Sequence, residues 1–404
     1  MQSLLGIALL LGIALLLSES RRTIRWRVVL SALFVQAAAG GFVLFVPLGQ
    51  RLLQTLADGV NQLVGYADQG TQFMFGPLAA EEMGFVVALR VLPVIVFVSS
   101  LVSILYYLRL MPLMVKTLGG IIHKVLGVSR VEGLASAANI FVGMVEAPLA
   151  VKPYLSGLTR SQFFCVLAGG LSSVTGAMLL AYAALGINLQ YLIAAAFMAA
   201  PGGILMAKLL VPEPVELPTA APVDPLSAEL SPASNIVEAA ADGAATGLKI
   251  ALSVGAMLVA FIGLLALANG LVSGVGGWFG YPQLSFDTIL GWLLSPIAFA
   301  MGIPWSEAGI AGNLIGQKTI LNEFVAYVSF VEVQSTMSTH SQAIITFALC
   351  GFANLSALAI LMGGMATLLP ARKSEVAQLG LKAVLAGTLS NLMSACLAGV
   401  FLSF

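Results

Sequence analysis

Two glutamates stand in stretches of the chain that are otherwise almost entirely apolar. Glu146 lies in NIFVGMVEAPLAV, and Glu323 lies in KTILNEFVAYVSF. A carboxylate at the centre of a bilayer is costly unless it faces water or a partner. We therefore expect both glutamates to line a polar cavity and to bind hydroxyls or amines of a solute. The alternative is a buried ion pair, for which Lys318 and Arg90 are the available cations.

The composition predicts a membrane protein. The chain has 404 residues, of which 59% are hydrophobic and only 9% are charged, whereas soluble domains carry about 25% charged residues. Apolar runs long enough to cross a bilayer recur along the chain. The fold class that follows is an all-α polytopic membrane protein. The formal net charge is zero, so nothing indicates a nucleic-acid partner.

Eight segments have the length and apolarity of transmembrane helices. They are residues 3–18, 28–48, 84–107, 161–184, 188–211, 246–272, 342–368 and 376–403. Basic residues gather in alternate loops, and the positive-inside rule then places both termini on the outer face. The first apolar run has no basic region before it and is followed by RRTIRWR, which favours a first span over a signal peptide.

Two further segments are predicted to be re-entrant hairpins of opposite orientation. Residues 131–158 must begin and end on the inner side, and residues 304–331 must begin and end on the outer side. Each segment is long enough for two half-helices and holds one of the glutamates near its middle. Irregular backbone at membrane depth is tolerated where it lines a cavity or is buried in protein.

The chain also contains a weak internal repeat. FFCVLAGGLSSVTGAMLLAY and IITFALCGFANLSALAILMGG are both interrupted by small residues, and aligning Gly170 with Gly351 pairs Ser173 with Asn354. Each follows a glutamate-bearing hairpin, and one extra span (246–272) separates the two halves, so the second copy is inverted. Inverted repeats with paired broken helices point to the midplane site of a secondary transporter. The alternative is two unrelated Gly-rich spans.

Four residues near the breaks form a candidate sodium site. Sodium binds hard oxygens, and broken helices supply free carbonyls. Asn139 and Ser173 offer side-chain oxygens, while Val142 and Val174 offer main-chain oxygens. Ordinary hydrogen bonding between helices is the alternative.

Asn354 and Phe352 form a second candidate group, in the other broken segment. The amide of Asn354 is suited to a solute hydroxyl, and the ring of Phe352 is suited to stacking on a flat solute. A role in helix packing stays open for both.

At these residues the chain resembles a known family. NIFVGMVEAPL, GQKTILNEFVAY, ALCGFANLS and AGTLSNLMSA resemble the concentrative nucleoside transporters of the bacterial eight-span type. The resemblance implies a homotrimer in which a mobile transport domain moves like an elevator within a scaffold. It also implies symport of nucleosides with sodium, or with protons in some members.

The chain is accordingly divided into five parts. They are scaffold spans with an outer amphipathic helix (1–107), the first half of the transport domain with an inner interfacial helix (108–211), a cytoplasmic linker rich in Pro, Glu and Ser (212–245), a scaffold span (246–272), and the second half of the transport domain (273–404).

The resemblance also assigns roles to single residues. Glu146 and Glu323 fall on the substrate-site glutamates, Asn354 and Phe352 fall on the ribose side, and Met178 falls on an apolar position near the base. The sodium-site positions are Asn139, Val142, Ser173 and Val174.

Three positions depart from the family pattern. Met144 and Val145 stand where many members have Gln-Thr, and Ala357 stands where a serine is usual, with Ser356 beside it. Each hydrogen bond lost to a desolvated partner costs about 0.5–1.5 kcal/mol. We therefore expect Met144, Val145 and Ser356 at the substrate site and a weaker or altered base preference.

The prediction from the sequence is a sodium-coupled nucleoside symporter. A proton-coupled symporter, in which Glu146 or Glu323 titrates, is the nearest alternative. An intramembrane enzyme is disfavoured because the spans contain no paired aspartates, no Ser-His pair and no HExxH motif. Accumulation of solute against a gradient would exclude a channel.

Overall fold

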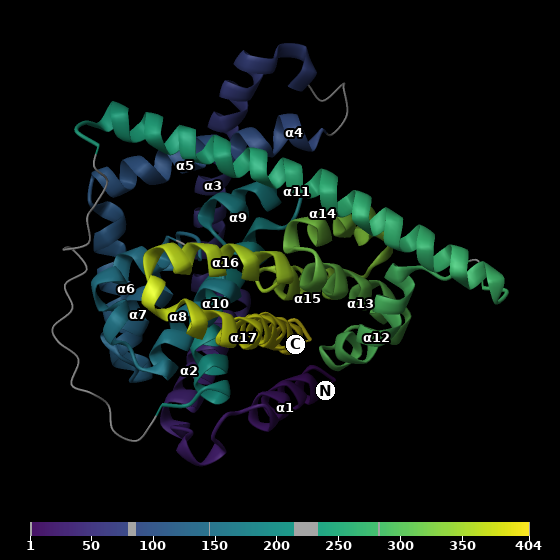
Figure 1. Cartoon of the computed structure of the whole chain (residues 1–404). Coiled ribbons are helices and arrows are strands. Elements are labelled where there is room, and N and C mark those ends of the chain that lie inside the picture. Colours follow the sequence, from purple (N-terminus) through teal and green to yellow (C-terminus); the bar gives the residue numbers. More distant parts are fainter. Residues whose placement is uncertain (1, 80–85, 145, 214–232, 282, 404) are drawn as a thin grey trace.

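The computed structural model describes residues 2–79, 86–144, 146–213, 233–281 and 283–403, and all regular structure in these ranges is helical. The first half contains α1 (Gln2–Leu16), α2 (Trp26–Phe45), α3 (Pro47–Phe75), α4 (Val87–Arg90), α5 (Leu92–Tyr107), α6 (Leu110–Leu126), α7 (Arg130–Ala138), α8 (Arg160–Ser172), α9 (Gly176–Ala184) and α10 (Leu189–Leu210). The second half contains α11 (Ile236–Trp278), α12 (Phe286–Ala300), α13 (Trp305–Ile320), α14 (Glu323–Val333), α15 (Thr339–Leu349), α16 (Leu355–Leu368) and α17 (Lys373–Phe401). Figure 1 shows their arrangement.

Several helices are long and apolar enough to cross a membrane. Within the described residues these are Trp26–Phe45, Val87–Tyr107, Arg160–Ala184, Leu189–Leu210, Ile236–Trp278 and Pro370–Phe401. Two of the eight predicted spans lie on shorter helices, because α1 has 15 residues and the segment 342–368 is divided between α15 and α16. The all-helical class with several apolar helices agrees with the prediction, while the count of eight stays a prediction.

One helix covers the predicted boundary between the linker 212–245 and the span 246–272. α11 begins at Ile236, inside the predicted linker, and runs for 43 residues, so it contains the whole predicted span. Asn235 starts it by accepting hydrogen bonds from Val237 N and Glu238 N, a strong N-cap. At 1.5 Å per residue α11 is roughly 65 Å long, about twice the hydrocarbon thickness of a bilayer.

The segment 131–158 is not built from two α-helical halves. Its first half is α7, but its second half, Ala147–Gly157, is a 3-10 helix that contains Pro148 and Pro153. Proline has no N–H to donate and disrupts an α-helix interior. The predicted segment 304–331 corresponds to α13 and α14. The apolar helix α12, before it in the chain, was not predicted; the chain bends by 115° between α12 and α13.

Two groups of helices pack together. α1 and α2 pack against α10 and α17, where Gln36 Nε2 donates to Ser394 Oγ at 2.9 Å. α5 packs instead along α11, where Ser100 Oγ donates to Ala240 O at 2.8 Å. The scaffold predicted for residues 1–107 therefore contains helices from both packing groups, and the division into scaffold and transport domain stays a prediction.

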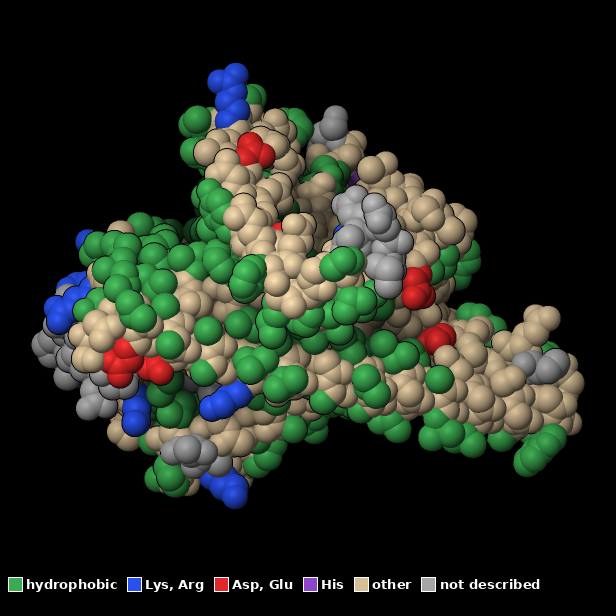
Figure 2. Space-filling view, turned by 90° about the horizontal axis from the view of Figure 1, so that it is seen from above, with side chains coloured by type: hydrophobic (Ala, Val, Ile, Leu, Met, Phe, Trp, Pro, Cys, Tyr) green, Lys and Arg blue, Asp and Glu red, His purple; other side chains and the backbone are tan. Residues whose placement is uncertain are grey.

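The outer surface is strongly apolar. Along α11, Leu252, Val259 and Leu271 are 64%, 81% and 63% exposed. In Figure 2, apolar side chains cover much of the visible face, with charged groups scattered among them. An apolar surface of this extent is typical of a protein that contacts lipid or other subunits.

Both Gly- and Ser-rich segments are broken helices, and Asn391 of α17 joins the breaks. α8 ends at Ser172, and α15 ends at Leu349. Asn391 Nδ2 donates to Ser172 O at 2.7 Å and to Cys350 O at 2.9 Å. These hydrogen bonds satisfy carbonyls that a broken helix leaves free. The two halves of the chain thereby meet at one buried amide.

Candidate functional site

Glu323 lies at the start of α14, at the turn between α13 and α14. Asn322 caps this helix by accepting a hydrogen bond from Val325 N at 2.8 Å. A helix N-terminus favours a carboxylate because its free N–H groups and its dipole are positive. The Glu323 carboxylate also accepts from Tyr182 Oη at 3.0 Å and from Asn354 Nδ2 at 2.8 Å. The local fold therefore fixes both carboxylate oxygens of a buried glutamate.

Asn354 has only one orientation that satisfies its neighbours. It caps α16, and its Oδ1 accepts from Ala357 N at 2.7 Å and from Ser356 Oγ at 2.8 Å. The amide nitrogen must therefore face Glu323. Phe352 precedes the cap, is half-buried, and donates its N–H to Ser173 O at 3.1 Å. The structure thus brings together Glu323, Asn354 and Ser356. Phe352 lies two residues before Asn354 in the chain.

Tyr182 belongs to this cluster and was missed by the sequence analysis. Its ring is fully buried and lies 4.5 Å from the ring of Tyr327, centroid to centroid. The available signal was its position, four residues after Met178 and therefore on the same face of α9. Met178 is itself buried and donates its N–H to Thr175 Oγ1 at 3.1 Å.

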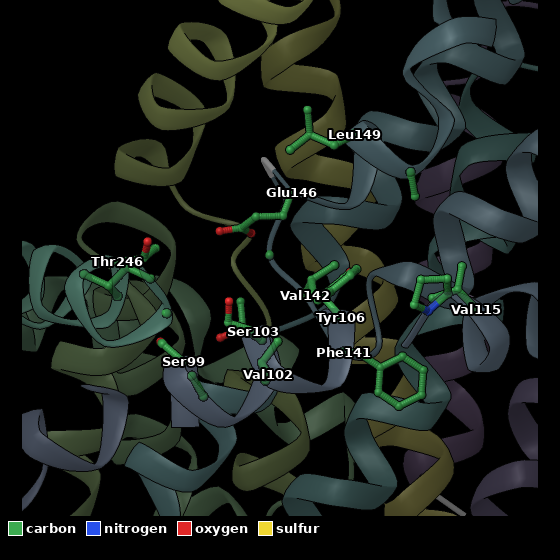
Figure 3. A pocket seen from close by; sticks show the side chains of 17 residues that line it. Ser99, Val102, Ser103, Tyr106, Val115, Phe141, Val142, Glu146, Leu149 and Thr246 are labelled. Carbon is green, nitrogen blue, oxygen red and sulfur yellow. The ribbon is translucent and has the colours of Figure 1, made fainter. Parts of the chain in front are cut away.

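Glu146 lines a cavity of about 350 Å³. Figure 3 shows its carboxylate facing this space, with Ser103 and Thr246 on other parts of the wall. The carboxylate lies directly against the backbone at Gly143, where a Cβ would displace Glu146 Oε2. This volume falls in the range of small-molecule pockets.

The two glutamates do not share this cavity. Among the described residues, the lining includes Glu146 and Val142 but neither Glu323 nor Asn354. Met144 does not line it either: a Cβ at Gly170 would lie 2.9 Å from Met144 Cβ, so this residue packs on α8. Val145 lies outside the described residues.

The sodium-site candidates include an unsatisfied amide. Both side-chain polar atoms of Asn139 are buried without a hydrogen-bond partner among the described residues. A Cβ at Gly169 would lie 3.3 Å from Asn139 Nδ2, and Ser173 Oγ donates to Gly169 O at 3.2 Å. Both candidates therefore lie against the same glycine of α8.

Val142 and Val174 lie at the two backbone breaks, between α7 and the 3-10 helix and between α8 and α9. Their carbonyls accept no hydrogen bond from the described part of the chain. Free carbonyl, amide and hydroxyl oxygens are the donor set that a hard cation prefers, so this set fits sodium.

The ion-pair alternative for the glutamates is not realised in the described residues. No Lys or Arg nitrogen there lies within 4.0 Å of a carboxylate oxygen of Glu146 or Glu323. Lys318 Nζ donates instead to Asn391 Oδ1 at 2.8 Å, and Arg90 Nη2 is 3.5 Å from Ala79 O.

Comparison with protein families defines the class of this chain. Residues 5–78 and 191–399 match the N-terminal and C-terminal models of the Na+ dependent nucleoside transporters, and residues 88–188 match a model described as nucleoside recognition. These matches define a membrane transporter. The chain belongs to the concentrative nucleoside transporter family.

Named relatives cover the whole chain. It is 48% identical to the nucleoside permease NupC of Helicobacter pylori, over 99% of this chain and 97% of the relative. It is 44% identical to the putative nucleoside permease NupX of Escherichia coli, over 100% and 99%. The solved structure of CNTnw in an inward-facing substrate-bound state is 50% identical and superposes with a TM-score of 0.95, over 100% of this chain and 97% of that one.

Proposed function

We propose that this protein is a secondary active symporter that takes up nucleosides, driven by a sodium gradient. The observation that carries the proposal is the Glu323 cluster. A buried carboxylate, held by Tyr182 and Asn354 and without a cation within 4.0 Å in the described residues, is arranged to bind neutral hydroxyl groups. A nucleoside presents such hydroxyls on its ribose.

In this proposal Glu323, Asn354 and Phe352 hold the ribose, and Glu146 and Met178 lie toward the base. Since the cavity beside Glu146 does not include Glu323, the two parts must approach each other around the solute. Met144 and Val145 offer no side-chain hydrogen bond, which supports an altered base preference. Ser356 acts by holding the Asn354 amide.

Sodium is the second cargo. Asn139, Ser173 and the carbonyls of Val142 and Val174 would hold it at the break that follows α7. Binding there would order the segment that ends in Glu146, and this would couple sodium to solute. The unsatisfied Asn139 amide supports this assignment.

The membrane arrangement follows from the same proposal. Both glutamate-bearing segments enter the bilayer as re-entrant hairpins among eight spans, with both termini outside in a bacterial inner membrane. The contact of Ser3 with Gly399 supports a common side for the termini. In this proposal the protein forms homotrimers, and in each subunit the transport domain moves relative to the scaffold.

Uptake into proteoliposomes tests the proposal. Purified protein is reconstituted, and labelled uridine and adenosine are supplied with an inward sodium gradient, with choline in place of sodium, and with an inward proton gradient. Sodium-dependent accumulation above the external concentration is expected. Uptake driven by protons alone would replace sodium as the coupling ion, and the absence of any nucleoside uptake would refute the proposal.

A further inference from the structure

The helix pair α5 and α11 forms the wall of the Glu146 cavity that faces the hairpin. On α5 the lining residues Ser99, Val102, Ser103 and Tyr106 follow a spacing of three, four and seven residues, which places them on one helix face. Thr246 joins them from α11. Figure 3 labels these residues around the space that Glu146 faces.

Four hydroxyls on this wall have no hydrogen-bond partner in the part of the chain that the structure describes. Ser99, Ser103, Tyr106 and Thr246 line the cavity, and their hydroxyls make no hydrogen bond within the described residues. Serine and threonine in helices commonly donate to the carbonyl four residues earlier. Thr117 and Ser253 do so in this chain, at 2.9 Å and 2.8 Å.

Close helix packing explains the size of these residues but not their hydroxyls. A Cβ at Gly243 would lie 2.6 Å from Ser103 Cβ, and a Cβ at Gly247 would lie 2.8 Å from Ser99 Cβ. Small residues therefore let α5 and α11 approach each other. Alanine would allow the same approach, so the polar atoms facing the cavity remain to be explained.

We propose that Ser99, Ser103 and Thr246 determine base specificity by hydrogen-bonding the nucleobase edge from the α5–α11 wall. This inference rests on the proposed nucleoside transport. It supplies the polar groups that Met144, packed on Gly170, does not. A hydroxyl both donates and accepts and rotates freely, so this wall accepts bases that differ in their carbonyl and amino groups.

The ring of Phe141, on the hairpin side of the cavity, and the ring of Tyr106 add apolar surface for a flat base. The nucleoside is then contacted from two sides. Its ribose meets the Glu323 cluster, and its base meets hydroxyls from α5 and α11. This division predicts that hydroxyl removal changes base selectivity and leaves ribose recognition intact.

The test compares Ser99→Ala, Ser103→Ala and Thr246→Val with Ser100→Ala as the matched control. Ser100 is a neighbour on α5 whose hydroxyl donates to Ala240 O and does not line the cavity. Apparent KM values for uridine, cytidine, adenosine and inosine are measured in proteoliposomes. The sodium concentration for half-maximal uptake is measured in parallel.

Each cavity substitution is expected to raise KM for the preferred nucleoside by about 2- to 10-fold, the value of one net hydrogen bond. The differences in KM among the four nucleosides should therefore become smaller. The sodium requirement stays within about twofold, and Ser100→Ala leaves the spread unchanged. An unchanged KM spread in all three cavity variants would overturn the inference while leaving nucleoside transport intact. A wild-type protein that carries none of the four nucleosides would refute the proposed function and this inference with it.

Discussion

Removing the Tyr182 hydroxyl tests whether the Glu323 carboxylate must be held in one orientation. Tyr182→Phe keeps the buried ring and its contact with Tyr327, and it deletes only the 3.0 Å hydrogen bond to Glu323 Oε1. The Asn354 amide at 2.8 Å remains as the other side-chain donor. The carboxylate then gains a rotational freedom that nucleoside binding must remove.

The size of the effect follows from the charge of the acceptor. A hydrogen bond to a charged group contributes about 1.5–3 kcal/mol, and each 1.4 kcal/mol corresponds to tenfold in affinity. If Tyr182 orients Glu323 for the ribose hydroxyls, its loss raises the apparent KM for uridine by about 10- to 100-fold. The sodium requirement, which we propose is set near Asn139, is expected to change little.

Tyr327→Phe is the matched control. It removes an equally buried hydroxyl from the neighbouring ring, but that hydroxyl donates to Thr346 O at 2.8 Å rather than to a carboxylate. Uptake kinetics in proteoliposomes, with protein content matched, compare the two variants. A KM for Tyr182→Phe within twofold of wild type, or equal losses in both variants, would refute the reasoning.

Three further predictions follow from local geometry. Gly143→Ala places a Cβ against Glu146 Oε2, so the carboxylate must move and nucleoside uptake is expected to fall at least tenfold. Asn139→Ala removes the unsatisfied amide, and uptake is expected to lose its stimulation by sodium. The side-chain hydrogen bond from Arg160 lowers the pKa of Glu19; this stabilisation is present above the ordinary carboxyl pKa and is lost as the pH falls through the lowered value. For these partly exposed groups the loss is at most about 1 kcal/mol, measured by thermal unfolding in detergent between pH 7 and pH 3.

Each of these predictions has a control. Gly157→Ala meets no atom within 4 Å and keeps normal uptake; equal loss in both variants would show that the contact with Glu146 is not the cause. Sodium stimulation that survives Asn139→Ala would place the cation elsewhere. Glu19→Gln removes the charge paired with Arg160 and Lys382. It should reduce the loss of thermal stability at acid pH. If stability depends on pH in the same way in this variant as in wild type, Glu19 is not the group responsible.

Local sequence patterns located the breaks in the chain. Glycines and serines inside apolar helices predicted the interruptions at Ser173 and Asn354, because these residues and their caps act over three or four positions. The length and predicted topology of residues 304–331 placed Glu323 near the middle of a hairpin, and the local cap that begins the new helix there is Asn322. These are short-range effects, and the sequence records them directly.

Long-range contacts were not predictable in this way. Asn391 lies in the quoted segment AGTLSNLMSA, but its bonds to Ser172 O and Cys350 O join residues 219 and 41 positions away. Tyr182 reaches Glu323 across 141 positions. The cavity wall of α5 and α11 depends on how two distant helices pack, and no spacing within either helix specifies the partner.

The measurement that tests the central claim most directly is sodium-driven uridine accumulation by wild-type protein and by Glu323→Gln, at matched reconstitution. Glutamine keeps the size of the side chain and an acceptor for the Tyr182 hydroxyl, but it removes the charge. The account predicts accumulation above the external concentration for wild type and loss of accumulation for Glu323→Gln, with the variant still folded. Equal accumulation by both proteins would contradict the claim that this carboxylate binds the solute.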